Sequence, residues 1–210
     1  MKKILTLTLA LISVFILTAC GGSPQKADSA AAKNEASTAA VKTAENDDTP
    51  KNILVAYFSC TGTTKSLAEQ TAKVLHGDIY EIKPAAPYST ADLDYNDEMC
   101  RAKIEQDSPN LRPELAEAVP DLSKYDTIVI AYPIWYGQEP RVVDSFTEKA
   151  DFANKTVVPI CTSGGSDIGR SGEFLRQLAS PKANWKEGRR FESIDEDVIE
   201  AFFYEIGLMK

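Results

Sequence analysis

Three short runs of β-branched and aromatic residues constrain the fold of this chain more than any other feature. They are residues 53–58 (ILVAYF), 127–131 (TIVIA) and 156–161 (TVVPIC). Apolar runs without polar alternation are typical of strands that are buried on both faces of a parallel sheet. The residues that follow the first run, 63–76, have helical spacing, and Gly77 comes where a helix stop is expected.

The rest of the chain continues this alternation of strands and helices. Residues 78–82 and 186–191 are predicted to add two strands, and residues 96–106, 141–152, 170–179 and 195–206 are predicted helices. Alternating elements imply right-handed crossovers and helices on both faces of the sheet. The sequence therefore predicts an α/β fold with a doubly wound, five-stranded parallel sheet of order 2-1-3-4-5. Its ligand site is expected beyond the carboxyl ends of the strands.

The first nineteen residues have the features of an export signal. Lys2 and Lys3 precede an apolar run over residues 4–17, which is shorter than the roughly 20 residues that span a bilayer. The following Leu-Thr-Ala-Cys segment resembles the cleavage box of bacterial lipoproteins. This resemblance implies that Cys20 becomes the lipidated N-terminus of the mature protein, anchored by its acyl chains outside the cytoplasm.

A polar segment separates Cys20 from the apolar runs. Residues 21–50 contain no aromatic residue, and Val41 is their only large aliphatic residue. Such a segment cannot bury enough apolar surface to offset its chain entropy, so it is predicted to be a disordered tether. The predicted organisation is a signal peptide at 1–19, the lipidated cysteine and linker at 20–50, and one domain at 51–210.

The net charge of the chain restricts the classes of molecule that it is expected to bind. The formal net charge is −8, and removal of Lys2 and Lys3 with the signal gives −8 − 2 = −10. A strongly acidic protein is not expected to bind nucleic acid or anionic lipid headgroups, whereas it can bind a basic redox protein.

The cysteines indicate neither a disulfide framework nor a zinc site. Without Cys20, an odd number remains: Cys60, Cys100 and Cys161. At least one of them is therefore a free thiol or pairs between chains. No Cys-x-x-Cys occurs, so neither a redox dithiol nor a zinc ribbon is predicted, and no metal ligands are assigned.

The loop after the first predicted strand carries four hydroxyl groups around one glycine. Backbone N–H groups at the start of a helix attract an anion, and hydroxyls add hydrogen-bond donors without adding charge. The arrangement suits a phosphate monoester, although one Ser or Thr could also serve as a simple helix cap. The candidate ligands are Ser59, Cys60, Thr61, Gly62, Thr63 and Thr64.

Other phosphate-binding patterns are missing from this loop. A P-loop needs a second glycine followed by lysine, and a dinucleotide fold needs Gly-x-Gly-x-x-Gly after the first strand. A receiver domain needs acidic residues where Ser59 stands. A low-molecular-weight phosphatase needs an arginine six residues after its cysteine, and none follows Cys60 or Cys161 at that distance.

The pattern Ser59-x-Thr61-Gly62-x-Thr64 resembles the phosphate loop of flavodoxins that bind flavin mononucleotide (FMN). The resemblance covers residues 52 to about 208 and is greatest to the branch with an aromatic loop after strand three. It implies that the aromatic loop flanks the flavin ring through Pro133, Ile134, Trp135, Tyr136 and Gly137. Trp135 or Tyr136 is expected to stack on the ring.

The loop after the fourth predicted strand is rich in glycine. In proteins that resemble this chain, the corresponding loop borders the flavin, which implies that Ser163, Gly164 and Gly165 contact it. Tyr88, Tyr95 and Asn96 lie in the long middle segment, where they are expected either to cover the flavin or partner site or to belong to the core and surface.

Three functions remain compatible with the sequence. The first is an FMN-binding electron carrier with an unidentified redox protein as partner, and the second is an FMN-dependent reductase of NAD(P)H or quinones. The third is a flavin-free interaction module. No catalytic residue is assigned, because the single histidine, His76, lies outside all three loops.

Overall fold

The computed structural model describes residues 52–210, so the predicted signal peptide, Cys20 and linker lie outside the described residues. The strands are β1 (Ile53–Tyr57), β2 (Asp78–Glu81), β3 (Thr127–Pro133), β4 (Thr156–Thr162), β5 (Asn184–Trp185) and β6 (Arg189–Arg190). The helices are α1 (Thr63–Leu75), the 3-10 helix η1 (Ala91–Leu93), α2 (Arg101–Gln106), α3 (Arg141–Lys149), α4 (Ser171–Leu178) and α5 (Glu196–Glu205).

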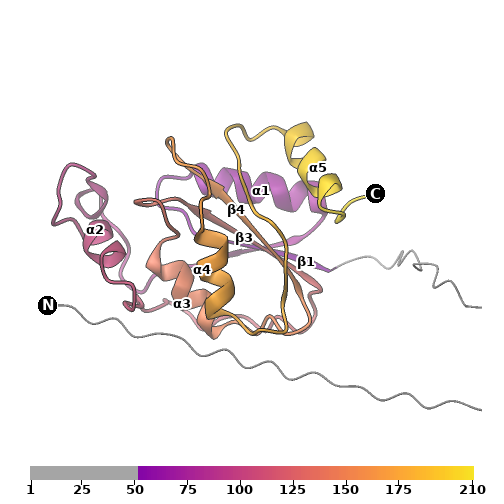
Figure 1. Cartoon of the computed structure of the whole chain (residues 1–210), viewed down its shortest axis with the longest axis horizontal. Helices are drawn as coiled ribbons and strands as arrows, with labels where there is room; N and C mark the ends of the chain where they lie inside the picture. The colour runs from indigo at the N-terminus through magenta and orange to yellow at the C-terminus, as the bar shows by residue number, and fades with distance from the viewer. Residues whose placement is uncertain (1–51) are drawn as a thin grey trace, which may run out of the picture. The chain divides into compact units, whose positions relative to one another are not determined.

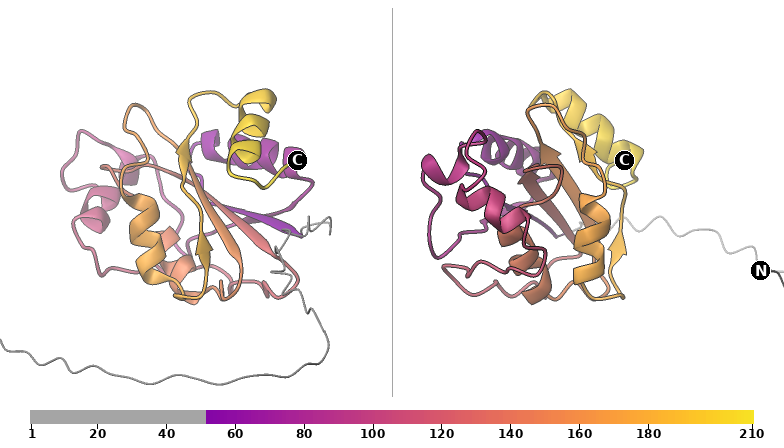
Figure 2. Two further views of the ribbon diagram at one scale, coloured as in Figure 1. Left: turned by 45° about the vertical axis from the view of Figure 1, so that its right-hand side comes forward. Right: turned by 60° about the vertical axis from the view of Figure 1, so that its left-hand side comes forward.

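The strands form one parallel sheet in the order β2-β1-β3-β4-β5, which confirms the predicted topology. Helices α1 and α5 cover one face of the sheet, and α3 and α4 cover the other (Figure 1). The two turned views show the same layers (Figure 2). No helix within residues 52–210 has the length and apolar character needed to cross a bilayer.

Burial of both faces explains the continuous apolar character of the central strands. Leu54 and Ala56 of β1 pack into the core under α3 and α4, whereas Ile53, Val55 and Tyr57 pack toward α1 and α5. Successive side chains of a strand point to opposite faces, so a strand with two covered faces needs apolar residues at every position.

The edge strand differs from its prediction. In place of one strand over residues 186–191, β5 and β6 both pair with β4 and are separated by residues 186–188. The stretch of β4 that pairs with neither edge strand contains Pro159, which pairs with β3 on its other side and has no backbone N–H to donate. Gly188 approaches it so closely that an added Cβ would lie 2.5 Å from the Pro159 carbonyl oxygen.

The helix predicted over residues 96–106 is shorter in the structure, where α2 begins only at Arg101. In the residues before α2, aspartate side chains accept hydrogen bonds from backbone N–H groups. Asp94 accepts from the Asn96 N–H, and Asp97 accepts from the Met99 N–H. These local bonds compete with helix formation and hold the chain in turns.

Candidate functional site

A cleft of about 380 Å³ lies where the carboxyl ends of β1, β3, β4 and β6 meet. This is the switch point of the sheet, where crossovers leave toward opposite faces and open a crevice. Its walls come from all three predicted loops, through Ser59, Cys60, Thr61, Thr63, Thr64, Pro133, Ile134, Trp135, Ser163 and Gly164. Four other predicted residues, Gly62, Tyr136, Gly137 and Gly165, do not line it.

The first loop presents unused hydrogen-bond donors to the cleft. Gly62 is the N-cap of α1, with φ 94°, and no side chain caps the helix. The first intrahelical bond runs from the Ser66 N–H to the Gly62 carbonyl, so the N–H groups of the first turn are not used by the helix. The simple-cap interpretation is therefore wrong, and the helix start can serve an anion.

The four hydroxyls of this loop have different roles. The Ser59 hydroxyl accepts from the Gly62 N–H at 3.1 Å and closes the loop. The Thr64 hydroxyl shares a 2.8 Å hydrogen bond with that of Thr162, which ties the start of α1 to the end of β4. Within residues 52–210, the hydroxyls of Thr61 and Thr63 have no protein partner, so they are the ones available to a ligand.

The second loop places its tryptophan at the base of the cleft. Trp135 is 5% exposed, and its ring packs edge-on against Phe58 at 5.4 Å and Tyr88 at 5.1 Å. These contacts hold the indole in place. Because little of it is exposed, only a small part of the ring faces the cleft.

A tight turn at residues 135–138 follows. The backbone groups of Trp135 and Gln138 exchange two hydrogen bonds, of 2.9 and 3.0 Å, and the two central residues both have positive φ. Tyr136 has φ 47°, a region that favours glycine, so this turn is locally strained. We call residues 135–138 the ring-side turn.

Tyr136 does not line the cleft and packs against the middle segment. Its ring centroid lies 5.0 Å from that of Tyr95, and its hydroxyl lies 3.6 Å from the Cys100 sulfur. Of the two aromatic residues expected to stack on a ligand, only Trp135 therefore lines the cleft.

The third loop leaves open space beside the cleft. A Cβ added at Gly164 or Gly165 would meet no atom within 4 Å, so neither glycine is required by packing against the protein. Arg190 donates from Nη1 to the Gly165 carbonyl at 3.2 Å and braces the loop from β6.

The remaining walls come from residues that sequence reasoning either left out or assigned only generally. Thr162 and the residues after β6, Phe191 and Glu192, line the cleft, as do Leu93 and Tyr95 of the middle segment. The ends of β4 and β6 could have been inferred, since parallel strands end at the same edge. No sequence signal places Leu93 beside the first loop.

A second hollow adjoins the cleft and is called the side groove. It has a volume of about 750 Å³ and lies between the first loop and residues 88–96. It shares four lining residues with the cleft: Cys60, Thr61, Leu93 and Tyr95.

The cleft is nearly uncharged. Among the described residues that line it, Glu192 is the single acidic one, and none is a lysine, arginine or histidine. Cys60 is exposed as a residue, but partial desolvation of its thiol by the cleft walls raises its pKa to about 11, with Arg101 opposing and Glu105 adding to the shift. Cys60 is therefore a neutral thiol near pH 7. Within residues 52–210 no group of three His, Cys, Asp or Glu side chains could hold a metal ion.

The fold and this site define a flavodoxin-like protein: a doubly wound sheet with a hydroxyl-rich loop, an aromatic loop and a glycine loop at its carboxyl edge. A family model described as flavodoxin matches residues 52–206. The chain belongs to the flavodoxin family.

Solved structures agree with this assignment. A protein of Bacteroides eggerthii, provisionally assigned as a flavoprotein, is 44% identical, with a TM-score of 0.70 over 74% of this chain and 98% of that chain. A similar protein of Bacteroides uniformis is 39% identical, with a TM-score of 0.70 over 73% and 98%.

A flavoprotein of Lactobacillus acidophilus, solved in complex with FMN, shares the fold. It is 23% identical, with a TM-score of 0.52 over 67% of this chain and 93% of that one. No curated protein matches the chain.

The thiol of Cys60 gives a test of the environment in the cleft. Its raised pKa, about 11, predicts that alkylation by iodoacetamide still rises about tenfold per pH unit at about pH 9.5. An ordinary thiol with a pKa near 8.5 would already level off there. Peptide mass spectrometry follows Cys60 separately from the buried Cys100 and Cys161. A plateau near pH 9 would contradict the predicted burial.

Proposed function

We propose that this protein binds FMN in the cleft and carries electrons to or from a protein partner. The observation that carries the proposal is the first loop, whose free hydroxyls and helix start open into a cleft walled by the aromatic and glycine loops. A volume of about 380 Å³ lies within the range of small-molecule sites, roughly 300–1,000 Å³.

The residues present fit a phosphate monoester held by neutral donors. Thr61 and Thr63 offer hydroxyls, and the first turn of α1 adds N–H groups at the positive end of its dipole. No basic side chain lines the cleft, so these groups would have to supply the whole attraction.

The other two loops fit a flat ring. The rigid edge of Trp135 and the backbone at Ser163 and Gly164 stand on the walls of the same cleft, and the glycine leaves room for close approach. Bound FMN would supply the electron-carrying chemistry, and the protein would supply position and electrostatics. The FMN complex of the Lactobacillus protein with this fold supports the choice of ligand.

An electron carrier is favoured because the cleft offers no proton-transfer group suited to neutral pH. Its lining includes no histidine or lysine, and Cys60 retains its proton. A carrier needs only a positioned ring, whereas general acid–base catalysis needs a group with a pKa near the working pH.

Replacing the loop hydroxyls tests the phosphate site. The double variant Thr61→Ala and Thr63→Ala is expected to weaken FMN binding, because each lost hydrogen bond to a charged group costs about 1.5–3 kcal/mol, or at least tenfold in affinity. Quenching of FMN fluorescence during titration of the apoprotein measures this.

The matched control is Ser66→Ala, in the same helical turn, whose hydroxyl donates to the Gly62 carbonyl and does not line the cleft. Its affinity is expected to stay unchanged. The single variant Thr64→Ala removes only the hydrogen bond to Thr162, and so separates direct ligand contact from the positioning of the loop. Wild-type affinity in the double variant would place the phosphate elsewhere.

A reductase is the second candidate, and the side groove is the observation that favours it. A substrate in the side groove would adjoin the cleft at Cys60, Thr61, Leu93 and Tyr95. Such a site would let a small molecule reach the ring without a protein partner.

Anaerobic absorbance spectra distinguish carrier from reductase. We expect NAD(P)H alone to leave the flavin absorbance of purified holoprotein unchanged, with dithionite as the control for full bleaching. Loss of the flavin absorbance with NAD(P)H alone, at a rate typical of enzymatic turnover, would instead establish the reductase.

We also propose that Cys20 carries the lipid that anchors the protein outside the cytoplasm. The proposal is supported by the order of two lysines, an apolar run and the Leu-Thr-Ala-Cys segment. Expressed in a bacterium fed a labelled fatty acid, the wild-type chain should carry label and sediment with membranes. Cys20→Ala should lose both properties, whereas Cys60→Ser should retain them. Labelled Cys20→Ala would rule out this anchor.

A further inference from the structure

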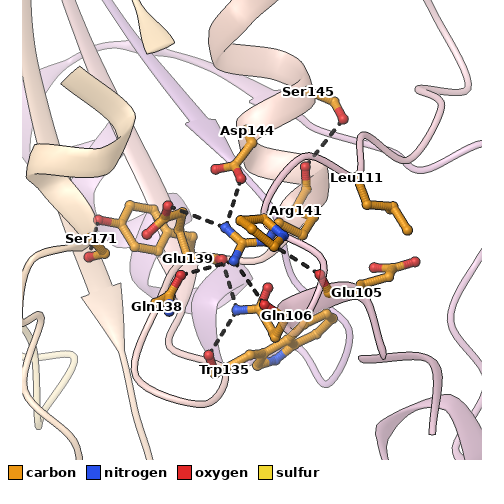
Figure 3. A network of polar contacts seen from close by, with 12 residues as sticks. Glu105, Gln106, Leu111, Trp135, Gln138, Glu139, Arg141, Asp144, Ser145 and Ser171 are labelled. Carbon is orange, nitrogen blue, oxygen red and sulfur yellow. Dashed lines mark hydrogen bonds and ion pairs between the residues drawn. The ribbon is translucent and has the colours of Figure 1, made fainter. Parts of the chain in front are cut away.

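A cluster of buried charges lies directly behind the ring-side turn. Arg141, Asp144 and Glu139 are all less than 5% exposed. Arg141 Nη1 lies 3.1 Å from Asp144 Oδ2 and 3.9 Å from Glu139 Oε1. Figure 3 shows dashed lines from the guanidinium to both carboxyl groups. Arg141 therefore faces two acids, while the second nearby cation, Arg112, is shared between Asp144 and Glu148. An unbalanced buried charge is costly.

The oxygens of this acid pair lack donors. Within residues 52–210, neither oxygen of Glu139 and not Oδ1 of Asp144 receives a hydrogen bond from any donor. Both carboxyl groups instead lie within 4 Å of the same nitrogen, Arg141 Nη1. Two buried carboxylates beside one guanidinium nitrogen repel each other, so the arrangement is favourable only when one of them is protonated.

Glu139 is the residue that holds the proton. Burial, and next the charge of Asp144, raise the pKa of Glu139 to about 8. Burial also raises the pKa of Asp144, but a hydrogen bond and charge from Arg141 oppose it. Arg141 is closer to Asp144, which therefore remains the anion.

The surrounding charged and titratable groups leave this assignment intact. Arg112, in the segment before β3, lies 3.7 Å from Asp144 and is itself paired with Glu148 at 2.7 Å. On β3, Tyr132 shares a hydrogen bond with Ser171, and burial raises the pKa of its phenol.

Hydrogen bonds connect the acid pair to the ring-side turn. Gln106 of α2 donates from Nε2 to the carbonyls of Trp135, at 2.9 Å, and Glu139, at 3.0 Å. Arg141 donates from Nη2 to the Gln138 side chain and the Gln106 carbonyl, both at 3.0 Å (Figure 3). The turn and the acid pair therefore form one rigid unit.

We propose that Glu139 and Asp144 share one proton, and that this proton is bound more tightly when electrons enter the adjacent flavin cleft. The second half rests on the function proposed above. Electrons supplied by a reduced protein partner add negative charge near the pair. Above its raised pKa, where Glu139 is ionised, its carboxylate then takes one proton from solvent and forms an O–H bond, and no other bond changes. At pH 7 Glu139 already holds this proton, so no uptake accompanies the electrons. By linkage, an ionised Glu139 makes the entry of electrons harder.

Infrared difference spectra of the apoprotein test the shared proton without any flavin. At pH 7 the wild type should show the C=O band of a buried protonated carboxylic acid. Glu139→Gln, which keeps a donor toward Asp144, should lack this band. Glu173→Gln, at an exposed carboxyl on α4 that pairs with Arg170, should retain it. A wild-type spectrum without the band would overturn the proposal.

Stability against pH gives a second flavin-free readout. The pKa of Glu139 is raised on folding from its ordinary 4.5 to about 8, so the folded protein binds more protons between these values. The free energy of unfolding should therefore fall between about pH 4.5 and 8, and less in Glu139→Gln. Identical pH profiles for the two proteins would contradict the assignment.

The midpoint potential of the holoprotein tests the coupling. Above about pH 8, uptake of one proton should add a tenfold change in the reduction equilibrium per pH unit, about 30 mV for two electrons. Glu139→Gln should lack this added slope, and Glu173→Gln should keep it. Identical plots of midpoint potential against pH for the wild type and Glu139→Gln would overturn the coupling. Failure to bind FMN would instead remove the proposed function and the coupling with it, while the infrared and stability results still decide the shared proton.

Discussion

Burial of both faces of a parallel sheet is the constraint on which the rest of this structure depends. Each central strand must be apolar at every position, so polar and flexible residues are confined to the loops. Because the strands are parallel, the loops that follow β1, β3, β4 and β6 emerge at one edge and face each other across the switch point. The cleft is thus a consequence of topology, and its chemistry follows from three short loop sequences.

The cleft combines a rigid base with neutral donors. Trp135 is held by two aromatic neighbours, and the Thr64–Thr162 hydrogen bond joins the first loop to β4, so the walls are positioned before any ligand arrives. Preorganised walls lower the entropy cost of binding. Since no cation lines the cleft, an anion there is compensated mainly by dipoles. Under the proposal above, the negative charge of bound, reduced flavin acts on the acid pair next to the ring-side turn.

That turn joins two parts of the protein that are distant in sequence. Its strained Tyr136 backbone is held between Gln106 of α2 and Arg141 of α3, and Tyr136 itself packs on Tyr95. The long middle segment is therefore built into the site: it supplies part of the cleft wall and fixes the turn from behind. Strain that is held by a buried polar network is found where a protein needs a defined local geometry.

The sequence alone was sufficient for the strand order, for most helix positions and for the three loops, because these depend on local periodicity and on a general rule of topology. It was not sufficient where contacts between distant residues decide. Pro159 and Gly188 together split the edge strand, and aspartates at 94 and 97 delay α2 until Arg101.

Tertiary structure alone decided three features of the site. Tyr136 packs on Tyr95 and does not line the cleft, Leu93 and Phe191 line it, and the carboxyls of Glu139 and Asp144 are buried beside the same Arg141 nitrogen. The physical reason is the same in each case. Burial and the distance between charges, which set packing and proton affinity, exist only once the chain has folded.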